Sequence, residues 1–142
     1  MTGLKSNELE AAVLRANAAF YRAFTTGDFA AMSELWAESA EVTCFHPGAA
    51  LIRGRAAVLS AWRQIIVQPA PFDMRCDHAH VRLLPGVAIV TCYEGNAEQP
   101  AHLAATNVFV LEQKRWRLLH HQAGPLARPI PKPSSHLSTG LN

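Results

Sequence analysis

The second half of the chain is a succession of long strand patterns joined by tight turns. The four predicted strands span residues 73–84, 87–97, 102–113 and 116–122. Their connections are Pro85-Gly86, a polar break at Glu98-Gln99-Pro100, and Lys114-Arg115. Parallel neighbours need a crossover of about a dozen residues or more, so strands joined this closely pair antiparallel. The pattern favours an antiparallel meander over βαβ units.

Helical patterns precede the meander. Residues 7–26 carry apolar side chains at spacings of three and four, which line one face of a helix. Asn7 with Glu10 fits a capping box, Ser6 is the alternative cap, and Gly27 ends the helix. The sequence therefore opens on one long amphipathic helix.

Two shorter helices follow. Asp28 caps the second, which forms a helical hairpin with the first. The third is predicted over residues 55–67, where Pro69 and Pro71 end it. The remaining extended segments are residues 40–45 and 51–52, separated by His46-Pro47-Gly48.

Together these elements predict an α+β domain over residues 7–123, with three helices packed on a curved, mostly antiparallel sheet. The first helix cannot cover the whole concave face, so a pocket is expected between helices and sheet. Residues 124–142 are proline-rich and are predicted to form an extended or disordered arm that does not continue the sheet.

The predicted strands carry more apolar side chains than one face of a sheet needs. This surplus predicts a homodimer that forms through the sheet. The side chains concerned are Val81, Leu83, Val90, Cys92, Val108 and Val110.

Composition excludes several classes of protein. The formal net charge is +2 and Lys and Arg do not cluster, so no nucleic-acid partner is expected. No apolar run approaches about 18 residues and no signal peptide is visible, which predicts no membrane association and a cytoplasmic location. Cys44, Cys76 and Cys92 are odd in number and form no CxxC pair, so buried, reduced thiols are expected.

No metal or cofactor is predicted. His120 and His121 are neighbours on one strand, so they face opposite sides and cannot chelate one ion together. The sequence does not decide which of the two faces the pocket. His78 and His80 share a face, but no Asp/Glu pattern supports a metal site there.

Four stretches in this order carry a family resemblance. They are residues 20–24 with 27–29, residues 36–42, residues 46–48 with 54–62, and residues 116–122. Through these four stretches the chain resembles the nuclear-transport-factor-two-like superfamily. The resemblance extends over about residues 8–123. That superfamily includes ketosteroid isomerase, SnoaL-like polyketide cyclases and the association domain of a calmodulin-dependent kinase. The resemblance implies a cone-shaped, cystatin-like fold with a deep pocket, and it implies much less about activity, because this fold hosts unrelated chemistries.

The resemblance also suggests where functional residues lie. Ketosteroid isomerases place a catalytic Asp before a proline after the first strand, and here His46 precedes Pro47 at that place. A second isomerase acid corresponds to Asn107, and the oxyanion-hole tyrosine falls near Phe20, with Tyr21 one residue later. None of the three isomerase residues is kept. The resemblance therefore argues against steroid isomerisation and leaves another use of the cavity open.

Three residues are the candidates for catalysis. His46 could act as acid or base at neutral pH, or could simply hold the His-Pro-Gly turn. Glu94 could shuttle a proton if it faces the cavity, and is otherwise a surface carboxylate. Asn107 could hold a ligand carbonyl, or tie down a water or a backbone group. The predicted ligand-binding wall consists of Tyr21, Phe24, Trp36, Trp62 and His120.

Two functions from different classes fit these residues. The first is an isomerase, cyclase or dehydratase type of enzyme that moves a proton on a small hydrophobic carbonyl compound, with His46 as the base. The second is a non-catalytic module that binds a small hydrophobic molecule or only dimerises. A polar cluster facing inward would favour the enzyme, and a purely apolar pocket would favour the binder.

Overall fold

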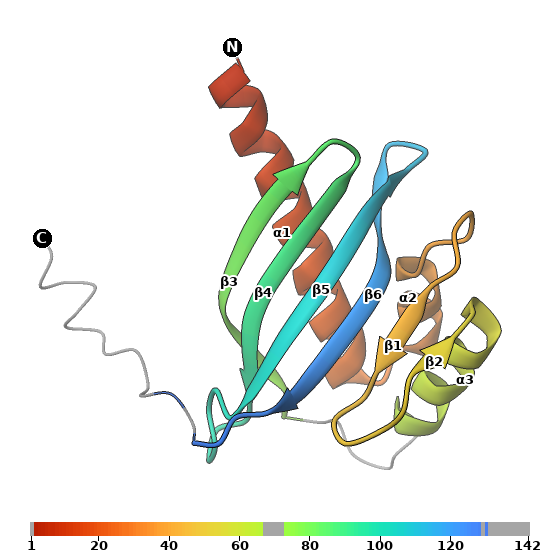
Figure 1. The fold of residues 1–142 in the computed structure, drawn as a ribbon, viewed down its shortest axis with the longest axis vertical. Helices are drawn as coiled ribbons and strands as arrows, with labels where there is room; N and C mark the ends of the chain where they lie inside the picture. The colour runs from red at the N-terminus through yellow and green to blue at the C-terminus, as the bar shows by residue number, and fades with distance from the viewer. Residues whose placement is uncertain (1, 67–72, 129, 131–142) are drawn as a thin grey trace, which may run out of the picture.

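The computed structural model describes residues 2–66, 73–128 and 130. Its described part contains three helices and one six-stranded sheet, so the predicted α+β class is confirmed (Figure 1). The helices are α1 (Thr2–Thr26), α2 (Phe29–Leu35) and α3 (Arg55–Ile66). The strands are β1 (Thr43–Phe45), β2 (Ile52–Arg53), β3 (Arg75–Leu84), β4 (Val87–Gly95), β5 (Leu103–Glu112) and β6 (Arg115–Pro125).

The sheet has the order β2-β1-β6-β5-β4-β3. The last four strands form the predicted antiparallel meander, and β1 joins it by pairing parallel with β6. In Figure 1, α1 runs along one face of this meander, while α2 and α3 lie at the end formed by β1 and β2. The sheet is therefore mixed but mostly antiparallel.

The helix boundaries differ from the prediction at one end. α1 begins at Thr2, so Asn7 and Glu10 lie inside the helix and do not cap it. Polar residues of this kind are tolerated in exposed helical turns, and residues 4–6 hold no glycine or proline that would stop the helix before Asn7; α1 even includes Gly3 in its first turn. The C-terminal prediction is confirmed: Gly27 has φ +69°, and the amide of Asp28 donates to the carbonyl of Ala23 at 3.0 Å.

The second helix is capped as predicted, because Asp28 Oδ1 accepts from the amide of Ala31 at 3.0 Å. The third helix begins at Arg55 as predicted, whereas Pro69 and Pro71 lie outside the described residues.

Two strand boundaries also differ. β1 is only three residues long, where residues 40–45 were expected. β6 continues to Pro125, three residues past the predicted end of the last strand, because β5 starts at Leu103 and pairs with Pro125 across the ladder. A proline is acceptable there, at the last position of a strand. Of the rest of the predicted arm, residues 126–128 and 130 follow the strand, whereas residue 129 and residues 131–142 lie outside the described part of the chain.

The core lies between the helices and the inner face of the sheet. Alternate residues of β4 and β5 point into it, and their neighbours point to the opposite, outer face. The largest apolar side chains in the core are Trp36, Trp62, Phe20, Phe109, Met32 and Leu118. This core separates an enclosed inner face from a more accessible outer face.

The six apolar strand residues that predicted a surplus are divided between the two faces. Val81, Leu83, Val90, Cys92 and Val110 belong to the core or pack against it. Val108 does lie on the outer face, between the inward-facing Asn107 and Phe109. The sequence pattern could not assign the two faces, because its alternation is the same from either side.

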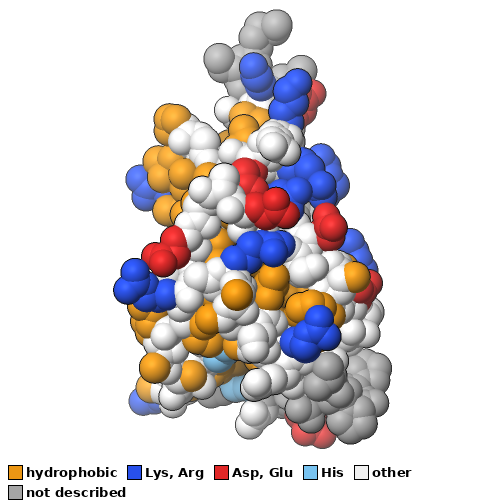
Figure 2. Space-filling view, turned by 90° about the vertical axis from the view of Figure 1, so that its right-hand side faces the viewer, with side chains coloured by type: hydrophobic (Ala, Val, Ile, Leu, Met, Phe, Trp, Pro, Cys, Tyr) orange, Lys and Arg blue, Asp and Glu red, His pale blue; other side chains and the backbone are white. Residues whose placement is uncertain are grey.

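The surface on the α2 and α3 side carries mixed charge. Figure 2 shows Lys and Arg side chains interspersed there with Asp and Glu. No basic patch gathers on this face, which agrees with the absence of Lys/Arg runs in the sequence. Within the described part of the chain, no helix combines the length and the hydropathy needed to cross a membrane.

Candidate functional site

A set of five polar side chains, here called the interior polar network, lies between α1 and the inner face of the sheet. Its members are Asn17, Tyr21, Glu94, Asn107 and His121. All five are buried, with exposed fractions of 0% to 6%. Buried polar groups on this scale need internal partners, because each one that lacks a partner costs about 1–3 kcal/mol.

The helix contributes Asn17 and Tyr21. They stand four residues apart on α1, so they lie one above the other on the same helical face. The neighbouring buried positions Val13 and Phe20 show that this face is the one turned toward the core. The helix therefore directs an amide and a phenol toward the sheet.

The sheet contributes Glu94, Asn107 and His121 from three adjacent strands. Asn107 of β5 and His121 of β6 are direct partners in the ladder, so their side chains stand together on the inner face. Glu94 occupies the same face of β4, two residues after the buried Cys92. Strand alternation thus brings an acid, an amide and an imidazole to one surface.

Hydrogen bonds connect all five members. Asn107 Nδ2 donates to Asn17 Oδ1 at 2.9 Å and to Tyr21 Oη at 3.2 Å. The Tyr21 hydroxyl donates to Glu94 Oε2 at 2.5 Å. His121 Nδ1 lies 2.5 Å from Asn107 Oδ1. A carbonyl oxygen can only accept, so this contact assigns the proton of the neutral ring to Nδ1 and leaves the lone pair on Nε2.

Burial decides the protonation states of the network. It raises the pKa of Glu94, against the opposing effects of the Tyr21 hydrogen bond and of His102. It also raises the pKa of Tyr21 well above its ordinary value, with Glu94 and Cys92 adding to the effect. Burial lowers the pKa of His121 to about 3, with His46 and His120 adding to it. At neutral pH His121 is therefore uncharged and Tyr21 keeps its proton.

His46 lies at the edge of this network. It follows β1, and its ring centroid is 4.8 Å from that of Trp62 and 6.3 Å from that of His121. Its Nε2 atom is 3.6 Å from Cys44 Sγ. Burial lowers the pKa of His46, which makes its ring neutral at pH 7.

The structure thus brings two of the three predicted catalytic residues into one network and places the third beside it. Asn107 and Glu94 are joined through Tyr21, and the ring of His46 lies beside the ring of His121.

The predicted ligand-binding residues fall in three places. Tyr21 belongs to the network itself. Trp36, Trp62 and Phe24 are packing residues: Trp62 contacts Phe20, Phe24 and His46, whereas Trp36 lies near Leu118 of β6. His120 is on the other side of β6, where its Nδ1 is 2.6 Å from Thr43 Oγ1.

Two members of the network, Asn17 and His121, were not among the predicted site residues. Asn17 had a usable signal, since it is a polar residue four positions before Tyr21 on the apolar face of the first helix. His121 had none that separated it from His120, because the sequence cannot tell the inner side of the last strand from the outer one.

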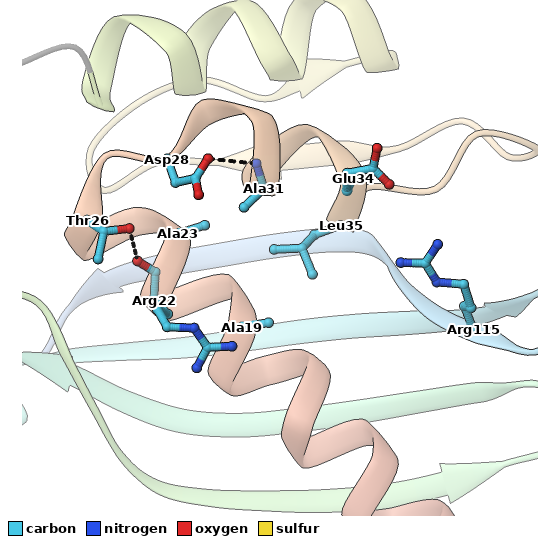
Figure 3. Close-up of a pocket in the computed structure, with 9 residues that line it drawn as sticks. All are labelled: Ala19, Arg22, Ala23, Thr26, Asp28, Ala31, Glu34, Leu35 and Arg115. Carbon is cyan, nitrogen blue, oxygen red and sulfur yellow. Dashed lines mark hydrogen bonds between the residues drawn. The ribbon is translucent and has the colours of Figure 1, made fainter.

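A surface pocket of about 600 Å³ lies apart from the network, between α1 and α2. Figure 3 shows the Arg22 and Arg115 side chains on different sides of it, with Asp28 and Glu34 also at its wall. All four of these charged side chains are exposed to solvent, unlike the buried groups of the interior polar network. The network is therefore the better candidate for chemistry.

Comparisons with known proteins agree with this fold. The family model of the SnoaL-like domain matches residues 13–128. A presumed dehydratase of the NTF2-like family from Streptomyces avermitilis is 32% identical, with a TM-score of 0.75 over 86% of this chain and 98% of that one. A presumed calcium/calmodulin-dependent protein kinase type II association domain from Thiobacillus denitrificans is also 32% identical, with a TM-score of 0.68 over 78% and 92%.

A more distant structure shares the fold, and one curated protein matches in sequence. A cystatin-like fold protein from Burkholderia xenovorans is 19% identical with a TM-score of 0.68, over 84% of this chain and 92% of that one. The F-box protein SKIP8 of Arabidopsis thaliana is 27% identical over 112 residues, which are 79% of this chain. The chain spans about half, 48%, of the length of that curated relative. With the family match over residues 13–128 and two structures at 32% identity, the chain belongs to the SnoaL-like domain family of NTF2-like proteins.

Proposed function

We propose that this protein is an enzyme that transfers a proton on a small hydrophobic carbonyl compound bound next to the interior polar network. The observation that carries the proposal is the buried Tyr21–Glu94 pair, 2.5 Å apart and linked to Asn107. An apolar pair of similar size would fill this space without the cost of desolvating a carboxyl group. Ionisable groups held in a core with shifted pKa values are typical of sites that handle protons.

The hydrogen bonds of the Tyr21 hydroxyl support a role for Tyr21 in binding the substrate oxygen. In the structure Tyr21 Oη donates to Glu94 Oε2 and accepts from Asn107 Nδ2. Because burial raises the pKa of Glu94, protonation of this carboxyl would reverse the first bond, so that Glu94 donates to Tyr21 Oη. Tyr21 Oη would then accept twice, and its own hydrogen could turn from Glu94, or from Cys92 Sγ at 3.4 Å, to a ligand oxygen. A phenol held in this way would stabilise the enolate oxygen that forms when a carbon acid loses its proton.

His46 is the proposed base. Its neutral ring can accept a proton from the carbon next to the carbonyl and return it to a neighbouring carbon or to a leaving hydroxyl. Trp62, which packs against both His46 and His121, supports a ligand at this place. Its Nε1 is buried without a hydrogen-bond partner among the described residues, and a ligand oxygen would satisfy it.

Similarity to the presumed dehydratase at 32% identity also supports an enzyme. Dehydration of a 3-hydroxy carbonyl compound begins with the same proton abstraction. We therefore expect the substrate to be a small hydrophobic ketone or ester with an acidic C–H bond. The cytoplasm is the proposed location, and it suits a protein whose three cysteines are free thiols.

The test does not require the natural substrate. The protein is incubated in deuterated buffer with a panel of small 3-hydroxy and α,β-unsaturated ketones and esters, and deuterium entry next to the carbonyl is followed by NMR. Exchange should occur with at least one compound, and His46→Gln and Tyr21→Phe should each slow it by about 10²–10⁴-fold, as expected for loss of a general base or an oxyanion donor.

Two matched variants serve as controls. Tyr93→Phe alters a half-buried tyrosine on the outer face of β4, and His120→Gln alters the histidine beside Thr43. Both should exchange deuterium at the parent rate. Full exchange in His46→Gln would reject His46 as the base, and absence of exchange with every compound would favour the alternative function.

That alternative is an association module that forms a homodimer through the outer face of the sheet. Ile89 and Val108 are direct partners in the ladder and stand on this face, and neither belongs to the core cluster. The similarity to the presumed association domain supports it. Light scattering at micromolar concentration should give the mass of two chains, and Val108→Lys should halve it. A single-chain mass for the parent protein would contradict the dimer. The control is Leu51→Lys, which introduces the same charge at a loop position that is 44% exposed and should keep the mass of two chains.

A further inference from the structure

Two of the three cysteines lie together at the edge of the interior polar network. Cys76 on β3 is the ladder partner of Glu94, and Cys92 precedes Glu94 by two residues on β4. The two cysteines are therefore diagonal neighbours on the inner face of adjacent strands. Each thiol also shifts the pKa of the other, lowering that of Cys76 and raising that of Cys92, which agrees with this placement.

Both thiols also contact the network. Asn17 Nδ2 donates to Cys76 Sγ at 3.6 Å, and Tyr21 Oη lies 3.4 Å from Cys92 Sγ. Cys44 is different, because it is fully buried on β1 beside His46. Only Cys76 and Cys92 thus combine a thiol neighbour with contacts to the proposed site.

The local backbone gives this pair access and freedom to move. β3 is the edge strand of the sheet, and its pairing with β4 shifts between Asp77 and His80, where His78 has φ +58°. Cys76, which directly precedes this bulge, is half-buried. Diagonal cross-strand Cα atoms are about 7–8 Å apart, slightly beyond the about 5.5–6 Å usual for a disulfide. An edge strand with a bulge can make that adjustment.

We propose that Cys76 and Cys92 are a redox-modification site, which peroxide converts to an intramolecular disulfide. The Cys76 thiolate attacks one peroxide oxygen, the O–O bond breaks, and a sulfenic acid forms as the other oxygen leaves and takes up a proton. The Cys92 sulfur then attacks the Cys76 sulfur, the S–O bond breaks, and water leaves. Two thiols are oxidised to one disulfide. Hydrogen peroxide is thereby reduced to two water molecules, and an alkyl hydroperoxide to one water and one alcohol.

The surroundings assign the order of attack. The neighbouring Cys92 lowers the pKa of the Cys76 thiol, with Asn17 adding to the effect against burial, Glu94 and Asp77. Cys76 and burial raise the pKa of Cys92, and burial raises that of Cys44 to about 12. Cys76 therefore reacts first and Cys92 resolves the intermediate.

The disulfide would also reach the proposed active site. It converts the sulfur acceptor of Asn17 and the sulfur neighbour of Tyr21 into one crosslink between β3 and β4. Loss of deuterium exchange on oxidation, restored by a thiol reductant, is the expected consequence. This last consequence rests on the proposed function, whereas formation of the disulfide does not.

The experiment treats the folded protein with a small excess of hydrogen peroxide, blocks the remaining thiols with iodoacetamide, and locates them by mass spectrometry. Two of the three thiols should be lost, with a Cys76–Cys92 peptide pair lighter by two hydrogen atoms. Cys92→Ser should leave a sulfenic acid on Cys76 that dimedone traps, and Cys76→Ser should abolish the reaction. Cys44→Ser is the matched control and should oxidise like the parent.

Circular dichroism confirms that each variant is folded, and Cys92→Ala replaces Cys92→Ser if the serine variant is not. Oxidation of Cys44 at the rate of Cys76, a disulfide that joins two chains, or three thiols that stay reduced would each overturn the proposal. Because these readouts need no substrate, their failure is distinct from failure of the deuterium exchange.

Discussion

The inner face of the sheet has two neighbouring regions that are equally buried and chemically opposite. One region is apolar, with Phe109 and Leu118 completely enclosed against the helices. The other holds Glu94, Asn107 and His121, of which none is more than 2% exposed. The two regions meet on a single strand, since Asn107 and Phe109 are two residues apart on β5. They differ in what burial does to the free energy of unfolding.

Burial stabilises the apolar region directly, by about 25 cal/mol for each Å² removed from water. Burial of the polar region removes the hydration of its polar groups. The hydrogen bonds formed inside the protein offset this loss of free energy only in part or at best fully. A chain selected for stability alone would extend the apolar region across the whole face. The polar region therefore indicates a use other than stability, and four predictions test the contrast between the two.

The largest effect is expected from acid acting on His121. Its pKa is lowered to about 3 from an ordinary 6.5. Between these two pH values the imidazole is protonated in the unfolded chain but not in the folded chain. The resulting stability is fully present above pH 6.5 and is lost as the pH falls toward 3, by about 5 kcal/mol in total. Urea unfolding from pH 7 to pH 4 should show the parent losing stability relative to His121→Gln. His120→Gln should keep the parent's slope, and equal slopes in parent and His121→Gln would refute a buried neutral imidazole.

Removal of a ring from the apolar region should have the next largest effect. Phe109→Ala leaves a cavity in the core and should reduce the free energy of unfolding at pH 7 by about 3–5 kcal/mol. Chemical denaturation measures this difference. Leu111→Ala on the same strand, where the side chain is 43% exposed, should cost far less. Similar losses in the two variants would mean that the core does not close over β5 as described.

A smaller loss is expected from Tyr21→Phe in the polar region. The variant removes the donor to Glu94 and one acceptor of Asn107, which should cost about 1–3 kcal/mol. Tyr93→Phe, on the outer face of the neighbouring strand, should stay within about 0.5 kcal/mol. A Tyr21→Phe protein that gains stability would show that the hydrogen bonds do not repay the burial of the hydroxyl.

The smallest change is expected for Glu94→Gln at the acidic end of the pH range, where a neutral amide replaces a protonated acid. Because burial raises the folded pKa of Glu94, its contribution to stability is present below the ordinary value of about 4.3 and is lost as the pH rises through the raised pKa. Glu94→Gln should therefore become more stable relative to the parent as the pH increases. Thermal melts at pH 5 and pH 8 measure the trend, and the opposite trend would mean that Glu94 is stabilised as a carboxylate.

Much of the fold was predictable because it depends on local signals. Gly27 and Asp28 act within one turn of the chain, and their roles as helix stop and cap are confirmed. The start of α1 was wrong by five residues, because the capping pattern at Asn7 and Glu10 competes with a helix that continues through residues 2–6, and the ends of helices are the least certain part of such a prediction. The parallel pairing of β1 with β6 joins residues about 77 positions apart, such as Thr43 and His120, and no local pattern encodes such a pairing.

The site divides in the same way. The sequence by itself determined the residue types: an acid on one strand, an amide on the next, a pair of histidines on the last, and a His-Pro-Gly break. Alternation on each strand was also fixed by the chain. Only the tertiary structure decided that Glu94, Asn107 and His121 share the inner face while His120 and Val108 do not. The reason is that alternation has two solutions, and packing of α1 against one face selects between them.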